Sequence, residues 1–172
     1  AVFRELSAAG GEDLGAAPGE RWLAHRYDVS FGQSRLYAAG AFVDTMEVAA
    51  PWDRVVPTYR AVRKAVGELV FIMCHLSHAY PEGCSLYFTF IGVDKSGDID
   101  ATAAKYDAVW KAALDASMGA GACVSHHHGI GISKAAQLHR ELGPGGVGLL
   151  KELKRACDPD GILNPGKLGL EH

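Results

Sequence analysis

Two stretches of the chain alternate apolar and polar residues as half-buried β-strands do. Residues 42–48 alternate and are rich in Val, Thr and Phe, and residues 84–93 alternate along most of their length. Between them, residues 69–74 form a continuous apolar run, which predicts a buried strand. A turn sequence, Pro81-Glu82-Gly83, separates this run from residues 84–93, so we expect the two to form a hairpin.

Other stretches have apolar residues at helical spacing. In residues 52–66, four side chains fall at i, i+4, i+7 and i+11 and form one face of a helix: Val55, Tyr59, Val62 and Val66. Residues 98–118 have a similar stripe, and Asp98 is suited to cap the first turn. Two shorter helices are expected at 133–142 and 147–157, with a glycine-rich corner between them.

The order of these elements indicates the fold class. With residues 122–125 as a fourth strand, the order is strand, helix, strand, strand, helix, strand, helices. This is the split βαβ pattern of a ferredoxin-like sheet. We therefore predict an α+β fold, with a mostly antiparallel sheet and helices packed on one face. Before the first strand we expect a short helix within residues 1–19, two helical turns at 20–27 and an irregular segment at 31–40.

Composition limits the classes of function. A net charge of −3 with scattered basic residues gives no electrostatic basis for binding nucleic acid. Four cysteines without C-x-x-C spacing predict free thiols in a reducing compartment, and we expect a cytoplasmic protein. We predict one domain over residues 1–169. The start at Ala1 and the ending Leu-Glu-His indicate a piece of a longer protein with an expression-tag remnant at 170–172.

The strand at 84–93 directs one tyrosine away from the core. Successive strand side chains point to opposite faces, and Leu86, Phe88 and Phe90 form the apolar face. Tyr87 and Thr89 therefore point the other way. Two interpretations remain open from the pattern: a tyrosine that packs on a half-exposed sheet, or one that faces a bound partner.

Three consecutive histidines follow the expected strand at 122–125. Strand alternation would place His126 and His128 on one face and His127 on the other. Gly129 and Gly131 allow a sharp turn and a close approach to a ligand. Imidazoles exchange protons near neutral pH, so one interpretation is proton transfer or binding of an oxyanion.

A metal site and a purely structural role are the other interpretations of the histidines. Zinc sites need three or four ligands in tetrahedral geometry. Adjacent residues of a strand do not converge on one ion, although His75 and His78 of the expected hairpin could add ligands. We predict no metal site.

Five sequence blocks together resemble a known family of domains. In chain order they are Pro51-Trp52-Asp53-Arg54-Val55, Ser77-His78-Ala79-Tyr80, residues 83–90 (GCSLYFTF), residues 125–131 (SHHHGIG) and residues 158–167 (DPDGILNPGK). They resemble the C-terminal cap domain of alkyl-dihydroxyacetonephosphate synthase-like FAD-linked oxidases, in the vanillyl-alcohol oxidase superfamily. Relatives that oxidise glycolate or D-lactate have Glu-His-Gly where this chain has His127-His128-Gly129.

The resemblance implies a flavoenzyme. FAD would be held by a separate N-terminal domain, and the cap domain would cover the flavin ring and contribute substrate-binding groups. The synthase exchanges the acyl chain of an ether-lipid precursor for a long-chain alcohol through an adduct at flavin N5. The resemblance implies that Tyr87 is an acid/base group and that His126, His127 and His128 move protons and neutralise the substrate's phosphate or enolate. We also expect Asn164 to contact the cofactor, a small-molecule or lipid-like substrate, and a homodimer.

One departure from the family pattern concerns substrate recognition. The family has an active-site arginine upstream of Pro51, where this chain has Gln33, and the nearest arginine is Arg35. We predict Gln33 and Arg35 as substrate-binding residues, although an amide does not replace the charge of a guanidinium. The alternative function is therefore the cap domain of a FAD-linked oxidase or dehydrogenase of a 2-hydroxy acid such as glycolate or D-lactate. A stand-alone ferredoxin-like binding or metal module is the third hypothesis.

Overall fold

A three-stranded antiparallel sheet lies at the centre of the larger of two compact units. The computed structural model describes residues 1–170, without the side chains of residues 29–31. The chain divides into the units Ala1–Ala39 and Gly40–His172. In the second unit, the strands are ordered β1-β3-β2 and have the bounds Ala41–Pro51 (β1), Phe71–Ser77 (β2) and Gly83–Val93 (β3).

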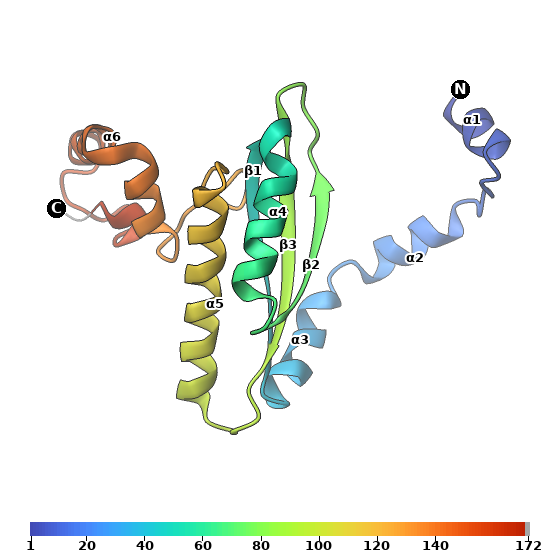
Figure 1. Ribbon diagram of the computed structural model, residues 1–172, viewed down its shortest axis with the longest axis horizontal. Coiled ribbons are helices and arrows are strands. Elements are labelled where there is room, and N and C mark those ends of the chain that lie inside the picture. Colours follow the sequence, from blue (N-terminus) through green and yellow to red (C-terminus); the bar gives the residue numbers. More distant parts are fainter. Residues whose placement is uncertain (171–172) are drawn as a thin grey trace. The chain divides into compact units, whose positions relative to one another are not determined.

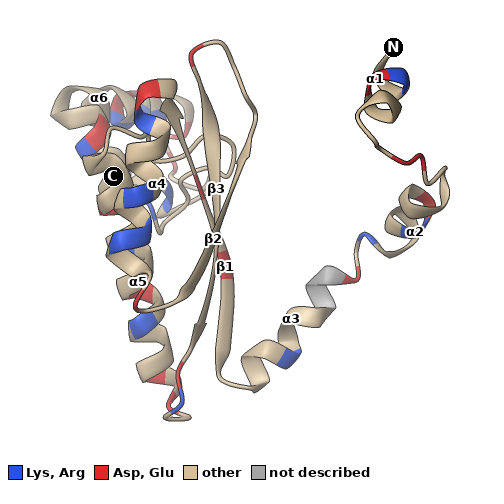
Figure 2. Ribbon diagram, turned by 45° about the vertical axis from the view of Figure 1, so that its right-hand side comes forward, with Lys and Arg blue, Asp and Glu red and all other residues tan. Residues whose placement is uncertain are grey.

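Two helices cover one face of this sheet. Helix α4 (Trp52–Val66) follows β1 and helix α5 (Ile99–Gly119) follows β3, and the two stand side by side (Figure 1). Seen along the sheet's edge, both lie on the same side, with acidic and basic residues interspersed along them (Figure 2). Asp98 caps α5 as predicted, since its side chain accepts the N–H of Asp100 at 2.9 Å. The predicted α+β fold with helices on one face is confirmed.

The strand alternation of β3 is confirmed by burial. Leu86, Phe88 and Phe90 are fully buried beneath the helices, whereas Tyr87 and Thr89 on the other face are half-buried. Each fully buried side chain of this size contributes about 1.5–3 kcal/mol through removal from water. Helices α4 and α5 do not cover the second face of the sheet, which carries Tyr87 and Thr89. We call this second face the open face.

The prediction that β2 is buried was wrong for one of its faces. Ile72 is 8% exposed and faces the helices, but Phe71 is 64% and Met73 is 46% exposed. β2 is an edge strand of a sheet that is covered on one face within this chain. A continuous apolar run therefore reflects an exposed apolar surface here as well as a core.

The prediction of a fourth strand at residues 122–125 was also wrong. This segment does lie beside β1, because the N–H of Cys123 donates to the carbonyl of Ala49 at 2.9 Å. The return bond of a strand ladder is absent, since the N–H of Ala49 donates to the Cys123 thiol at 3.3 Å. The following backbone amides donate to a buried carboxylate, so strand pairing ends after one bond.

The remaining helices flank these elements in sequence. The first unit contains α1 (Val2–Ala8), α2 (Ala17–His25) and α3 (Val29–Ala38). The prediction of an irregular segment at 31–40 was wrong, since most of it belongs to helix α3. A single glycine such as Gly32 destabilises a helix by only about 1 kcal/mol and does not prevent it from forming.

The long helix of the second unit is broken where the corner was predicted. Helix α6 (Ala135–Cys157) is interrupted at Gly143, whose φ of 65° is left-handed, and a 3₁₀ turn (Lys167–Gly169) follows the C-terminal loop. Over residues 1–170, none of the helices has the length and apolarity needed to cross a membrane.

Candidate functional site

Tyr87 lies in the middle of the open face. β3 is the central strand, and its pairing register places Glu47 of β1 and His75 of β2 directly opposite Tyr87 on either side. The phenol hydroxyl donates to the Thr45 hydroxyl at 3.2 Å. The ring centroids of Tyr87 and His75 are 5.7 Å apart. The predicted outward direction of Tyr87 is thus confirmed, and its hydroxyl lies among polar side chains.

The three consecutive histidines gather beside this tyrosine. The expected alternation between two faces was wrong, because the backbone at 126–128 is not a strand. The Nδ1 atoms of His126 and His127 are 3.2 Å apart, and the rings of His127 and His128 have centroids 4.7 Å apart. His128 in turn stands edge-on to Tyr87 at 5.0 Å. The imidazoles and the phenol therefore form one continuous group of titratable side chains.

A buried glutamate, which the sequence analysis did not identify, lies beneath this histidine loop. Glu47 is fully buried, and its Oε2 accepts the backbone N–H groups of His126 at 2.9 Å and His127 at 3.0 Å. Its Oε1 lies 3.3 Å from Nδ1 of His126 and 3.0 Å from Nδ1 of His127. The only sequence signal was an acidic residue inside a predicted strand, and Asp44 of the same strand gives the same signal.

The charge states within the site follow from these contacts. Burial raises the pKa of Glu47, but the N–H groups of His126 and His127 and the charge of their imidazoles outweigh it and hold the pKa below its ordinary value. Glu47 is therefore ionised at neutral pH. Burial lowers the pKa of His128, which keeps this imidazole neutral and able to accept a proton.

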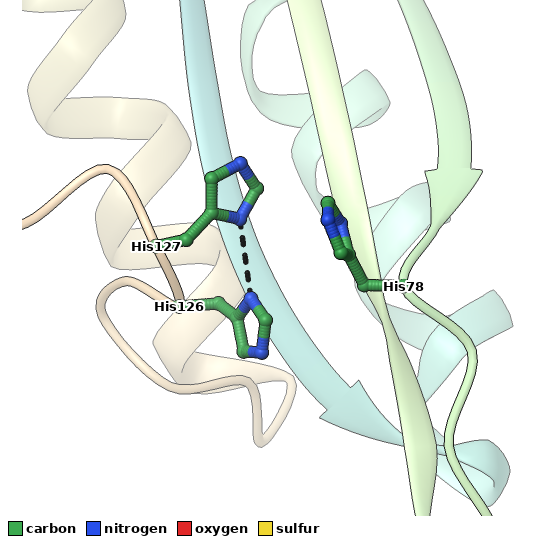
Figure 3. Close-up of side chains that lie close together, drawn as sticks. All are labelled: His78, His126 and His127. Atoms are coloured by element: carbon green, nitrogen blue, oxygen red, sulfur yellow. Dashed lines mark hydrogen bonds between the residues drawn. The ribbon is translucent and has the colours of Figure 1, made fainter.

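A fourth histidine approaches from the loop between β2 and β3. The ring centroid of His78 lies 4.6 Å from that of His127 and 5.6 Å from that of His126. Figure 3 shows the His78 ring opposite the two imidazoles of the loop. Its Nδ1 is 3.2 Å from the Ser77 hydroxyl and 3.4 Å from the Ser85 hydroxyl. His78 has a left-handed backbone, with a φ of 49°, so the ring's position is maintained against local strain.

These imidazoles could hold a metal ion. One nitrogen from each of His78, His126 and His127 lies within 4.8 Å of the others. The sequence argument that neighbouring histidines diverge does not apply, because these residues leave the strand conformation. His75 is not in this cluster and contacts Tyr87 instead. The absence of a metal stays a prediction.

Both ends of the histidine loop are anchored. Before it, the buried Lys134 ammonium donates to the Ser125 hydroxyl at 3.0 Å, and burial lowers the pKa of Lys134. After it, the backbone N–H of Leu168 donates to the carbonyl of Gly131 at 2.8 Å. The imidazoles therefore project from a loop whose backbone is held by side chains and by the C-terminal segment.

The other predicted site residues lie elsewhere in the chain. Gln33 and Arg35 belong to helix α3 of the first unit, where the Tyr37 hydroxyl donates to the Gln33 side chain at 3.3 Å. Asn164 is exposed in the C-terminal loop and has a left-handed φ of 47°, which asparagine tolerates well. Substrate binding by Gln33 and Arg35 and cofactor binding by Asn164 stay predictions.

The open-face site combines groups that donate, accept and stabilise protons. A phenol, a neutral imidazole and an imidazole pair above a carboxylate lie in sequence along a single surface. Such an arrangement is suited to acid/base chemistry and to binding an anion.

Comparisons with known proteins find relatives over nearly the whole chain. Residues 1–168 match the family described as FAD linked oxidases, C-terminal domain. The chain is 34% identical to alkyldihydroxyacetonephosphate synthase of Trypanosoma brucei brucei, over 95% of this chain and 27% of that protein. It is 30% identical to the synthase of Dictyostelium discoideum, over 97% of this chain and 28% of that protein.

A solved structure shares the fold. A structure of alkyldihydroxyacetonephosphate synthase superposes with a TM-score of 0.55 at 22% identity, over 90% of this chain and 24% of the other. The chain thus spans about a quarter of the length of the proteins it resembles. Because the family match extends over residues 1–168, the chain belongs to the FAD linked oxidases, C-terminal domain family.

Proposed function

We propose that this chain is the substrate-side domain of a FAD-dependent enzyme that resembles alkyldihydroxyacetonephosphate synthase. The observation that carries the proposal is the contact of Tyr87 with His128 on the open face, continued by His127 above Glu47. Relatives over nearly the whole chain support the choice of reaction. The reaction would be the exchange of an acyl chain for an alkyl chain in ether-lipid synthesis.

The described residues fit a flavin ring but not the rest of the cofactor. The open face presents the half-buried Tyr87 and, further along the sheet, exposed apolar residues of β2: Met73 opposite Thr89 and Phe71 opposite Ile91. The glycines at 129 and 131 do not open a helix, since α6 begins only at Ala135. They therefore lack the turn and helix N-terminus that bind a pyrophosphate in dinucleotide domains. A separate flavin-binding domain would hold FAD, which supplies the electrophilic ring that substrate carbon needs.

The residues of this chain would move the protons. Removal of a proton next to a carbonyl needs a base, and His128 is kept neutral by burial and can accept one. A free phenol in water loses its proton only near pH 10, so proton transfer from a phenol needs a partner such as this imidazole. His126 and His127 lie above the carboxylate of Glu47, and ring N–H groups in this position would donate to a phosphate or enolate.

The alternative function is oxidation of a 2-hydroxy acid by a FAD-linked oxidase or dehydrogenase. It is kept because Gln33 stands where the resembling synthases have an arginine, and an amide does not replace the charge with which a guanidinium binds a phosphate or a carboxylate. Both functions use the same acid/base groups on the open face.

Steady-state assays of the full-length protein test the proposal. Incorporation of a labelled long-chain alcohol into an acyl-dihydroxyacetonephosphate substrate, without consumption of an electron acceptor, is the expected result. Reduction of an electron acceptor by glycolate or D-lactate, with no alkyl exchange, would support the alternative and overturn the synthase proposal.

A further inference from the structure

We propose that Glu47 is the positioning residue of the histidine loop: it holds His126 and His127 in place and keeps a proton on at least one of their Nδ1 atoms. This inference rests on the proposed function, because it assigns Glu47 a part in the same acid/base chemistry. Glu47 belongs to β1, not to β3 or the histidine loop. Within residues 1–170, its side chain makes no hydrogen bond to His128 or to Thr45, which accepts the Tyr87 hydroxyl.

The first part of the argument concerns the loop backbone. Oε2 of Glu47 accepts the N–H groups of two consecutive residues, His126 and His127, at 2.9 and 3.0 Å. Two N–H groups converge on one atom only when the backbone turns, so these bonds replace the diverging pattern of a strand. The carboxylate thereby converts the end of a would-be fourth strand into a loop whose imidazoles gather on one side.

The second part concerns the other carboxylate oxygen. Oε1 is buried and has no hydrogen-bond partner in the part of the chain that the structure describes. It forms a triangle with two ring nitrogens, 3.3 Å from Nδ1 of His126 and 3.0 Å from Nδ1 of His127, which are 3.2 Å from each other. Three lone-pair atoms at these distances repel one another unless at least one proton lies between them.

The carboxylate is the fixed negative charge in this triangle. Glu47 is fully buried, so its attraction for a proton on His126 or His127 is weakly screened by solvent. The other described titratable groups around the triangle are the imidazoles of His78 and His128 and the phenol of Tyr80, which face the two rings, and the Cys123 thiol and Lys134 ammonium, which interact with Glu47. Glu47 is closest to the two nitrogens, and we infer that at least one Nδ1 carries a proton at neutral pH.

The third part links Glu47 to the phenol. Glu47 is the direct cross-strand partner of Tyr87 in the β1–β3 register. The side chain that binds the histidine loop therefore lies directly across from Tyr87 on the neighbouring strand. The contact of Tyr87 with His128 depends on this relation, because His128 directly follows the two residues that Glu47 binds.

Two substitutions separate charge from shape. In Glu47→Gln the side chain keeps its length and an oxygen that accepts the loop N–H groups, but loses its negative charge. In the full-length protein we expect kcat to fall about 10–100-fold with KM within about threefold, and the pH–rate profile to move by about one pH unit, the scale for losing a charge at this distance. Glu47→Asp keeps the charge but is shorter, and we expect it to retain the wild-type pH profile with reduced kcat.

Glu141 provides a matched control. Its carboxylate also accepts a backbone N–H of the same segment, from Val124 at 3.1 Å. Glu141 is exposed, however, and within residues 1–170 it makes no hydrogen bond or ion pair with the three consecutive histidines. Glu141→Gln should leave kcat and the pH profile unchanged. Equal loss in both variants would mean that Glu47 only anchors the segment, and the inference would be wrong.

A measurement on the wild-type chain needs no variant to fold. Imidazole ¹⁵N shifts report whether each Nδ1 carries a proton, and we expect at least one Nδ1–H on His126 or His127 at pH 7. Bare Nδ1 atoms on both rings would overturn the inference. Titration with Zn²⁺ alone adds a second check: stoichiometric binding that Glu47→Gln abolishes would make the carboxylate a metal ligand and also overturn it.

The failures of the two proposals are distinguishable. If Glu47→Gln has wild-type kinetics while Tyr87→Phe is inactive, the inference about Glu47 is wrong and the proposed function stands. If the ¹⁵N spectra show a proton on Nδ1 of His126 or His127 but the protein catalyses neither alkyl exchange nor oxidation of a 2-hydroxy acid, the proposed function is wrong and the placement of the proton stands.

Discussion

The ring of Tyr87 stands edge-on to the imidazole of His128, with centroids 5.0 Å apart and planes at 88°. Tyr87 belongs to the central strand and His128 to a loop held above the sheet by the Glu47 carboxylate. Edge-to-face pairs of this kind contribute about 0.5–1.5 kcal/mol beyond the burial of their surface. The contact therefore stabilises the arrangement in which a phenol and a neutral imidazole share one surface.

Loss of either end of the titratable group should abolish most activity. In the full-length protein, we expect Tyr87→Phe and His127→Ala each to reduce turnover at least about 100-fold, the usual scale for an acid/base group. Thr89 lies two residues further along β3 on the same face of the sheet. Thr89→Val serves as the control and should retain turnover. Near-normal rates in both site variants would remove the acid/base assignment.

Neighbouring residues of β3 should differ sharply in their effect on stability. Phe88 is fully buried under the helices, so Phe88→Ala should lower the free energy of unfolding by about 3–5 kcal/mol. Tyr87→Phe removes one hydroxyl from the half-buried open face and should change it by about 1 kcal/mol or less. Urea denaturation followed by circular dichroism measures both, and equal losses would contradict the one-sided core.

The stabilising effect of Glu47 should depend on pH. Its pKa in the folded chain is below the ordinary value of 4.5, so its ionisation stabilises the fold fully above pH 4.5. This contribution is lost as the pH falls below 4.5 and through the lower folded-state pKa, because the carboxylate is then protonated in both states. The difference in unfolding free energy between the wild type and Glu47→Gln should therefore shrink as the pH falls from neutral to below 4.5. A difference that stays constant over this range would contradict the lowered pKa.

The isolated chain should bind FAD weakly or not at all, and should be inactive. The proposed contact of this chain is with the flavin ring alone, and the glycines at 129 and 131 do not open a helix that could bind a pyrophosphate. After incubation with excess FAD and desalting, the chain should show no flavin absorbance. A retained flavin spectrum would mean that this chain grips the cofactor itself.

Short-range patterns predicted the fold and the direction of Tyr87. Alternation over residues 84–93 is enough to assign the two faces of β3, and helical spacing identified the buried stripe of α4. Helix α3 was not predicted, because Gly32 indicated an irregular segment although the good helix formers Arg35 and Leu36 follow it. These properties are local, so a single sequence contains them.

The geometry of the histidines could not be predicted in this way. It depends on a carboxylate that lies 79 and 80 positions earlier in the chain than the amides it binds. The Cys123 thiol likewise takes the place of a backbone acceptor for Ala49, which ends the expected strand. Side chains that replace backbone partners in this way leave no periodic signal in the sequence. Glu47 is one of two acidic residues in its strand, with Asp44, and nothing in the sequence distinguishes the two.

The most direct test of the central claim is a double-mutant cycle between Tyr87 and His128, measured as turnover of the full-length protein. If the two act as one acid/base unit, adding His128→Gln to Tyr87→Phe should lower turnover by less than about tenfold, although each change alone costs about 100-fold or more. If the two losses multiply, Tyr87 and His128 act independently, and the shared proton-transfer surface described above does not exist.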